Sequence, residues 1–198
     1  MSTHPITGGA RFGLARFGTP GGGDRYEVFI SSANECAPAR TLCREIIYGA
    51  VNPTLGTERG APMLVPVMWE DALPQRVEGE TINDFFVRVA LECHATIVLF
   101  ESVLGAGTKD EVLALLERPR SEQTPLAVIA FEPTDGRIRS AELTGFLQLI
   151  GQVAGILYAS TGSMNSQDAA VTVAKVTWGF AFSAAARSRQ PQLENDAI

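Results

Sequence analysis

The chain has 198 residues, of which 45% are hydrophobic, which is enough for one domain with a sizeable buried core. Its formal net charge is -6 and 19% of its residues are charged, with no basic stripe that could neutralise a row of phosphates. This composition argues against a nucleic-acid ligand and favours a small molecule or a protein partner.

Cysteine usage and the chain ends predict where the protein works. Cys36, Cys43 and Cys93 are an odd set with no spacing typical of zinc sites, so we expect reduced thiols, no bound metal and a cytoplasmic location. Residues 1–24 lack a continuous apolar run and are interpreted as a flexible segment, not a signal peptide. Residues 25–187 are predicted to form the domain and residues 188–198 a flexible tail.

Short apolar runs alternate with helical patterns along the domain. The predicted strands cover residues 26–32, 63–68, 96–100, 126–131 and 156–158. The predicted helices cover residues 38–51, 81–91, 109–117 and 141–152, and a last helix begins near residue 167. Asn52 and Pro53 are expected to end the first helix. Pro66 would remove a ladder hydrogen bond from a central strand, so the second strand is placed at an edge of the sheet.

This alternation predicts a fold and argues against a membrane span. Five strands with right-handed crossovers form a flavodoxin-like three-layer α/β sandwich with a five-stranded parallel sheet. The apolar stretch 141–160 carries Glu142, Gln148 and Gln152, and is better divided into a helix and a strand. The stretch 169–186 is rich in Ala and Thr, and we interpret it as a helix packed on the sheet or on another subunit.

Parallel sheets of this kind bind ligands at the carboxyl ends of their strands, and two of these ends carry polar or aromatic groups. Ser31, Ser32 and Asn34 lie between the first strand and a helix N-terminus, where an anionic group is favoured, although they could equally be N-caps. Trp69, which precedes Glu70 and Asp71, could stack on a base or a ring cation, or could belong to the core.

The third strand end is the turn over residues 104–111. Gly105 and Gly107 allow close approach of a sugar or phosphate, Thr108 can cap the following helix, and Glu111 is expected in its first turn. A Thr followed three residues later by a Glu is also a capping box, so a structural role for Glu111 is equally favoured. For His94, which precedes the third strand, we expect a structural role.

The order and spacing of several segments resemble the bacterial TIR-like domains. The matching segments are Tyr26–Glu35, Arg40, Val65–Asp71, Ile82–Asn83 and Leu104–Glu111. Those domains carry an "ISS" strand end, an arginine in the next helix, a "WE" strand end, and a "GT" followed by a glutamate. The resemblance covers roughly Arg25 to Phe131.

The resemblance implies an NAD glycohydrolase of bacterial antiphage defence that is active on assembly. The related nucleoside deoxyribosyltransferases use a similarly placed glutamate, and this role falls on Glu111. NAD is then a substrate, and no cofactor is expected. The substrate-binding residues would be Ser31, Ser32, Asn34, Trp69, Gly105, Gly107 and Thr108, with Arg40 as an ion partner.

The expected partners are NAD or a related nucleotide, further copies of the chain, and a separate sensor protein or small-molecule trigger. A fixed carboxylate near C1′ of the ribose would stabilise the positive charge that develops as nicotinamide leaves. Glu111 could act so directly, accept a ribose hydroxyl proton, or form a ribosyl ester. A non-enzymatic interaction or nucleotide-signal-binding module and a nucleoside deoxyribosyltransferase-like N-glycosidase stay open as alternatives.

Overall fold

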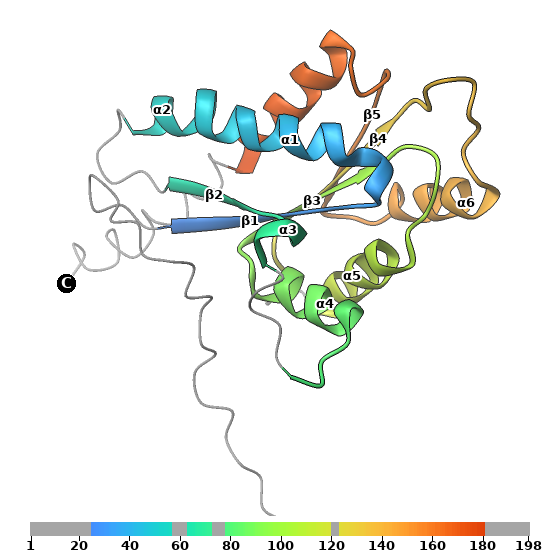
Figure 1. Cartoon of the computed structure of the whole chain (residues 1–198), viewed down its shortest axis with the longest axis horizontal. Helices are drawn as coiled ribbons and strands as arrows, with labels where there is room; N and C mark the ends of the chain where they lie inside the picture. Colours follow the sequence, from blue (N-terminus) through green and yellow to red (C-terminus); the bar gives the residue numbers. More distant parts are fainter. Residues whose placement is uncertain (1–24, 57–62, 73–77, 120–122, 181–198) are drawn as a thin grey trace, which may run out of the picture.

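A computed structural model describes residues 25–56, 63–72, 78–119 and 123–180, so the two predicted flexible ends lie outside the described residues. It is an α/β fold with one five-stranded, all-parallel sheet of strand order β2-β1-β3-β4-β5, flanked by helices on both faces. Figure 1 shows the sheet edge-on between the helices, as in a flavodoxin-like three-layer sandwich, and this prediction is confirmed.

The elements have the following bounds. The strands are β1 (Arg25–Ser32), β2 (Met63–Val67), β3 (Ala95–Phe100), β4 (Leu126–Phe131) and β5 (Ile156–Thr161). The helices are α1 (Ala37–Ile46), α2 (Asn52–Leu55), α3 (Trp69–Ala72), α4 (Ile82–Glu92), α5 (Ala106–Glu117), α6 (Ala141–Ile150) and a last helix described over residues 167–180. A 3-10 turn, η1 (Asn34–Cys36), precedes α1, and a π-helical turn, η2 (Ile47–Val51), follows it.

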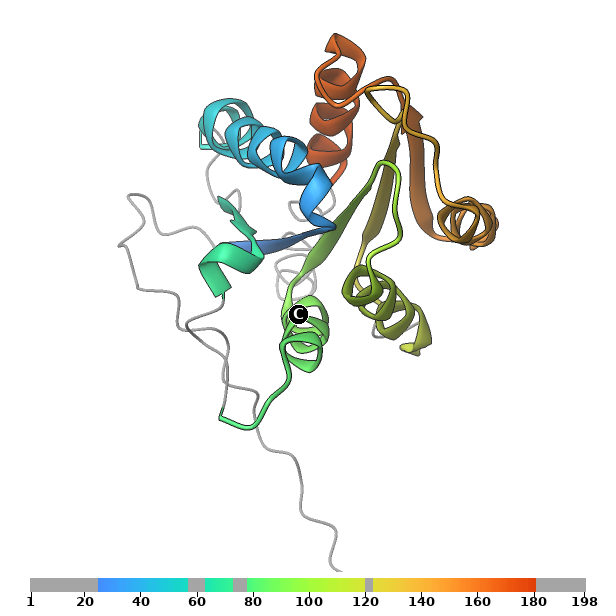
Figure 2. The ribbon, with the colours of Figure 1, turned by 45° about the vertical axis from the view of Figure 1, so that its right-hand side comes forward.

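Two hydrophobic clusters cover the two faces of the sheet. Helix α1 and the helix over residues 167–180 pack on one face, and α4, α5 and α6 pack on the other (Figure 2). Neighbouring residues of a strand point to opposite faces, so Val28 and Ile30 join the first cluster while Phe29 joins the second. Every residue of β3 and β4 is buried, which explains why their sequences are almost continuously apolar.

Strand β2 is an edge strand, as Pro66 predicts. Its backbone is held by the side chain of Asn52, which accepts a hydrogen bond from the Leu64 N–H at 2.9 Å and donates one to the Leu64 carbonyl at 2.8 Å. The prediction that Asn52 and Pro53 end the helix is wrong. Pro53 lies in the first turn of α2, directly after the π-helical turn, where a missing N–H costs little.

Several other boundaries differ from the sequence prediction. Helix α4 begins at Ile82, directly after the Thr81 N-cap, and Ile82 is 56% exposed because the buried face begins at Phe85. Strand β5 extends to Thr161, since its pairing with β4 continues through polar residues. Helix α5 begins at Ala106, three residues earlier than expected.

His94 and the cysteines have structural surroundings. His94 Nδ1 accepts a hydrogen bond from the Glu27 N–H at 3.1 Å, and its ring lies 5.0 Å from that of Tyr26. All three cysteines are free and buried, and burial raises the pKa of the Cys36 thiol to about 12. No helix in the described parts of the chain is long and apolar enough to span a bilayer.

We expect Asn52→Ala to lower the free energy of unfolding by about 1–3 kcal/mol, because two backbone groups of Leu64 lose their partner. Thr41→Ala is the matched control, since it removes an exposed side-chain hydrogen bond to the Ala37 carbonyl and should cost about 0.5 kcal/mol or less. Urea denaturation measures both, and equal losses in the two variants would contradict the role of Asn52.

Candidate functional site

The carboxyl end of β1 sends two neighbouring hydroxyls to opposite faces of the sheet. Ser31 points to the side of α5, where its Oγ donates a hydrogen bond to Glu111 Oε2. Ser32 points to the side of α1, where its Oγ accepts a hydrogen bond from Arg40 Nη1 at 2.6 Å. Successive side chains of a strand point to opposite faces of the sheet, so the adjacent residues Ser31 and Ser32 contact two separate clusters of predicted site residues.

Glu111 is a buried carboxylate with 6% of its surface exposed. Burial raises its pKa from 4.5 to about 7, and the charge of Asp110 adds to this, whereas the hydrogen bond from Ser31 lowers it. Within the described parts of the chain no cation pairs with it. A buried titratable group shifted in this way, at the carboxyl edge of an α/β sheet, marks a candidate functional site.

The capping box is not what holds Glu111. The N-cap of α5 is Gly105, which has extended backbone and no side-chain cap, so Thr108 lies inside the first turn and Glu111 in the second. Thr108 is 5% exposed and packed into the interior. The carboxylate of Glu111 contacts another element of the fold, so the interpretation as a helix cap is wrong.

Arg40 is the centre of the second cluster. It is 3% exposed, although helix arginines are usually solvated. Its guanidinium donates to the Ala33 carbonyl at 3.2 Å and to Glu70 Oε1 at 2.9 Å, and its Cζ lies 5.9 Å from the centroid of the Trp69 ring. Arg40 thus ties the end of β1 to α3 and already has a counter-ion, while half-buried Trp69 keeps an open part of its surface.

The two glycines of the predicted loop, Gly105 and Gly107, differ in how much space surrounds them. A Cβ at Gly107 would lie 2.8 Å from Asn83 Oδ1, and Asn83 itself donates a hydrogen bond to Asp110, so Gly107 permits the close packing of α4 and α5. A Cβ at Gly105 would meet only ordinary contacts, the nearest being Thr108 Oγ1 at 3.5 Å. Asn34 is exposed in η1, and its side chain does not cap the helical turn that follows.

An ionic network that was not predicted from the sequence lies at the same edge of the sheet. Glu35 accepts hydrogen bonds from the N–H groups of Ser102 at 2.8 Å and Val103 at 2.9 Å. Burial acts to raise its pKa, but these bonds, the Ser102 hydroxyl and the charge of Arg137 hold the pKa below the usual value. Arg137 Nη1 lies 3.5 Å from Glu35 Oε2.

The same arginine faces a second carboxylate, that of Glu101, which is fully buried at the end of β3. Glu101 Oε1 accepts hydrogen bonds from the Thr134 N–H at 3.0 Å and from its hydroxyl at 2.8 Å. Glu101 Oε2 makes no hydrogen bond to a described residue but lies 3.4 Å from Arg137 Nη2. A carboxylate immediately after an apolar strand is the sequence signal that could have found it.

The carboxylates at this edge therefore differ in how far neighbouring cations and hydrogen-bond donors offset their negative charge. Glu35 and Glu101 each have the guanidinium of Arg137 within 4 Å and accept hydrogen bonds from neighbouring donors. Among the described residues, Glu111 has one hydroxyl donor, Ser31, and an acidic neighbour, Asp110. Of these carboxylates, Glu111 is the one whose ionised form would gain most from a bound cation.

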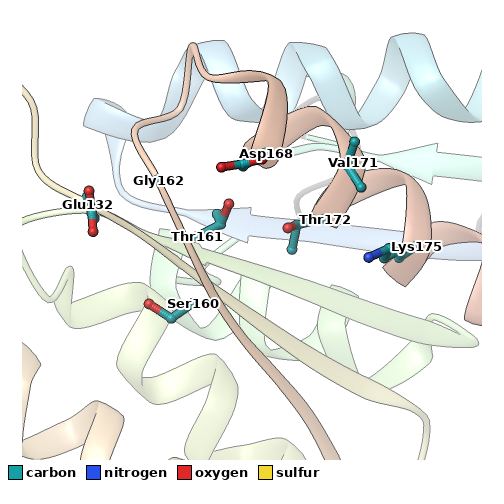
Figure 3. Close-up of a pocket in the computed structure, with 8 residues that line it drawn as sticks. All are labelled: Glu132, Ser160, Thr161, Gly162, Asp168, Val171, Thr172 and Lys175. Carbon is teal, nitrogen blue, oxygen red and sulfur yellow. The ribbon is translucent and has the colours of Figure 1, made fainter.

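Two cavities of about 420 Å³ each lie between described residues, and both flank β5 away from Glu111. One lies against the helix over residues 167–180 (Figure 3), and the other lies between α6 and Tyr158. Glu111 and Ser31 line neither of these two cavities. No group of three or more potential metal ligands is found among the residues that the structure describes.

No protein-family model matches the chain, and no curated protein is significantly similar to it.

Glu111 should make the stability of the protein fall as the pH rises. Its pKa is 4.5 when unfolded and about 7 when folded, so the folded state prefers the protonated carboxyl. The contribution is fully present below pH 4.5 and is lost as the pH rises through 7, with a total of roughly 3 kcal/mol. Glu111→Gln cannot ionise and should therefore be more stable than the wild type at pH 8.

Urea denaturation across this pH range measures the difference between the two proteins. Glu117→Gln is the matched control, because Glu117 is exposed on the same helix and its variant should follow the wild-type curve. Parallel curves for Glu111→Gln and the wild type would show that the carboxyl of Glu111 is not perturbed.

Arg40→Lys should lower the free energy of unfolding by about 1–3 kcal/mol, because an ammonium cannot reproduce the fork that holds Ser32, Ala33 and Glu70 together. Arg44→Lys, one turn later on α1 and without an ion pair to described residues, should change it by about 0.5 kcal/mol or less. Thermal or urea denaturation compares the two, and similar stabilities would mean that the buried fork contributes little.

Proposed function

We propose that the protein cleaves the N-glycosidic bond between nicotinamide and ribose in NAD, with Glu111 as the catalytic carboxylate. The observation that carries this proposal is the buried position of Glu111 at the carboxyl edge of the sheet, without a cation from the described residues. The resemblance to TIR-like domains adds the substrate and a role in bacterial antiphage defence.

The charge of the substrate suits this carboxylate. The nicotinamide ring of NAD is cationic, and as it leaves as a neutral pyridine the positive charge moves to the ribose. A fixed carboxylate beside C1′ stabilises that charge more in the transition state than in the ground state. The compensated carboxylates Glu35 and Glu101 would contribute far less, because Arg137 already neutralises them.

The raised pKa fits binding of a cationic substrate. Near neutral pH the free site holds a mixture of carboxyl and carboxylate, since the pKa of Glu111 is about 7. A cation placed beside it favours the ionised form and lowers that pKa. Substrate binding would therefore release a proton and produce the carboxylate that the reaction needs.

Other residues have supporting roles in this proposal. Ser31 orients Glu111, and movement of the Ser31 hydroxyl would free the carboxylate oxygen for the ribose. Trp69 offers a half-buried ring beside Arg40 as a platform for a base. Glu111 is 6% exposed, so an opening of the site by assembly or by a trigger would increase access of the substrate to the carboxylate.

The test is incubation of concentrated protein with NAD, with nicotinamide release followed by chromatography. Glu111→Gln should lower the rate by about a hundredfold or more, because a neutral amide cannot stabilise a developing cation. Glu117→Gln should leave the rate unchanged, since Glu117 is exposed at the far end of α5. If the wild type releases no nicotinamide even when crowded, the non-enzymatic module becomes the better hypothesis.

The pH dependence distinguishes the active form of Glu111. If the carboxylate acts, kcat/KM rises with pH through about 7, the pKa of the free site. Ser31→Ala removes the hydrogen bond that lowers this pKa, so the same rise should move to higher pH. A fall of kcat/KM over this range would instead show that the protonated carboxyl is required.

A further inference from the structure

The two edge strands, β2 and β5, differ in how far their backbones are protected from pairing with another chain. At β2 the side chain of Asn52 makes hydrogen bonds to both the N–H and the carbonyl of Leu64, and Pro66 has no backbone N–H that could pair with another strand. Strand β5 pairs only with β4 among the described residues, and its sequence contains no proline and no charge. Because an open, uncharged edge strand is a template for pairing with another chain, natural proteins normally protect or use it.

Exposed apolar side chains lie at this open edge. Leu157 and Tyr158 of β5 are both exposed, and the exposed Val171 lines the cavity beside the strand. Leu157 and Tyr158 point to opposite faces of the sheet, so the apolar surface continues around the edge. Exposed apolar side chains on an unpaired strand edge are typical of a protein interface.

The groove beside β5 is charged in opposite senses at its two ends. Figure 3 shows the cavity between β5 and the helix over residues 167–180, with Glu132 and Asp168 near the end of β5. Lys175 lies two helical turns beyond Asp168, about 10 Å along the helix axis. Asp168 and Lys175 are both exposed, and neither makes an ion pair with a described residue.

We propose that a second copy of this chain binds at β5, with the two β5 strands antiparallel about a two-fold axis. An axis beside β5 and perpendicular to the sheet keeps each face on its own side, so the sheet continues from one copy into the other. The acidic end of one groove then meets the basic end of the other, and Asp168 faces Lys175 of the second copy, twice in each dimer.

This charge pattern is what selects a second copy as the partner. A two-fold axis reverses the groove, and only a groove with opposite charges at its ends is complementary to its own reversed image. The exposed apolar side chains Leu157 and Tyr158 would be covered at the same time. The inference concerns association alone and does not rest on the proposed cleavage of NAD.

Sedimentation velocity of the full chain over a concentration series tests the interface. The wild type should dimerise, and Asp168→Lys or Lys175→Asp alone should weaken the dimer by about tenfold or more, because two attractive pairs become repulsive. Leu157→Lys should also give a monomer, since a lysine on an edge strand opposes pairing. Glu117→Lys is the matched charge reversal away from the interface and should leave the dimer unchanged.

Mixing the two charge-reversal variants gives the sharpest outcome. In the mixed dimer one pair has both of its charges exchanged and the other pair keeps its original Asp168 and Lys175, so both pairs are attractive. An equimolar mixture of D168K and K175D should therefore associate again. Circular dichroism checks that each variant is folded. A wild type that stays monomeric at every concentration, a dimer insensitive to these reversals, or a mixture that fails to associate would each overturn the proposal.

Discussion

The parallel pairing of β1 with β3 is the constraint on which the candidate site depends. It aligns Ser31 with Val98 and Ser32 with Leu99, so β1 ends level with the carboxyl half of its neighbour. The chain leaving β3 then turns into α5 directly beside the end of β1, and this brings Glu111 to Ser31. A shift of one residue in this register would point Ser31 to the wrong face and separate the pair.

The carboxylates at this edge of the sheet differ in whether an arginine lies beside them. Glu35 and Glu101 come from segments that follow β1 and β3, and Arg137 from the segment after β4 serves both of them. Glu111 and Arg40 lie on opposite faces of the sheet, and Arg40 is paired with Glu70. A buried carboxylate without a cation from the described residues lowers the stability of the fold near neutral pH, and such a cost is characteristic of functional sites.

Much of the fold could be predicted from the sequence because its signals are local. Apolar runs predicted both ends of β4 correctly and β3 within one residue, and Pro66 indicated an edge strand. Boundaries failed where two local signals compete. A Thr followed three residues later by a Glu predicts a capping box, but the extended backbone of Gly105 already begins α5 earlier.

The contacts of the candidate site could be predicted only in part, because the residues that meet there are distant in sequence. Glu111 was singled out from its turn and from the resemblance, but its hydrogen bond to a residue 80 positions away was not predicted. Nor could the sequence predict that Arg40 would be buried, since this depends on Glu70, 30 residues later. The hydrogen bond from the Ser102 N–H to Glu35 joins residues 67 positions apart, and no local sequence pattern predicts it.

The open edge at β5 is separated from the candidate site, because Glu111 contacts the end of β1 and the strands β3 and β4 lie between β1 and β5. If association controls the chemistry, its effect must cross the carboxyl ends of these strands. The network of Arg137 with Glu35 and Glu101 spans that distance, because its members follow β1, β3 and β4. It also fixes the loop at Ser102 that leads into α5, the helix that carries Glu111. A change at β5 that moved the segment after β4 would therefore act first on this ionic network and then on the position of Glu111.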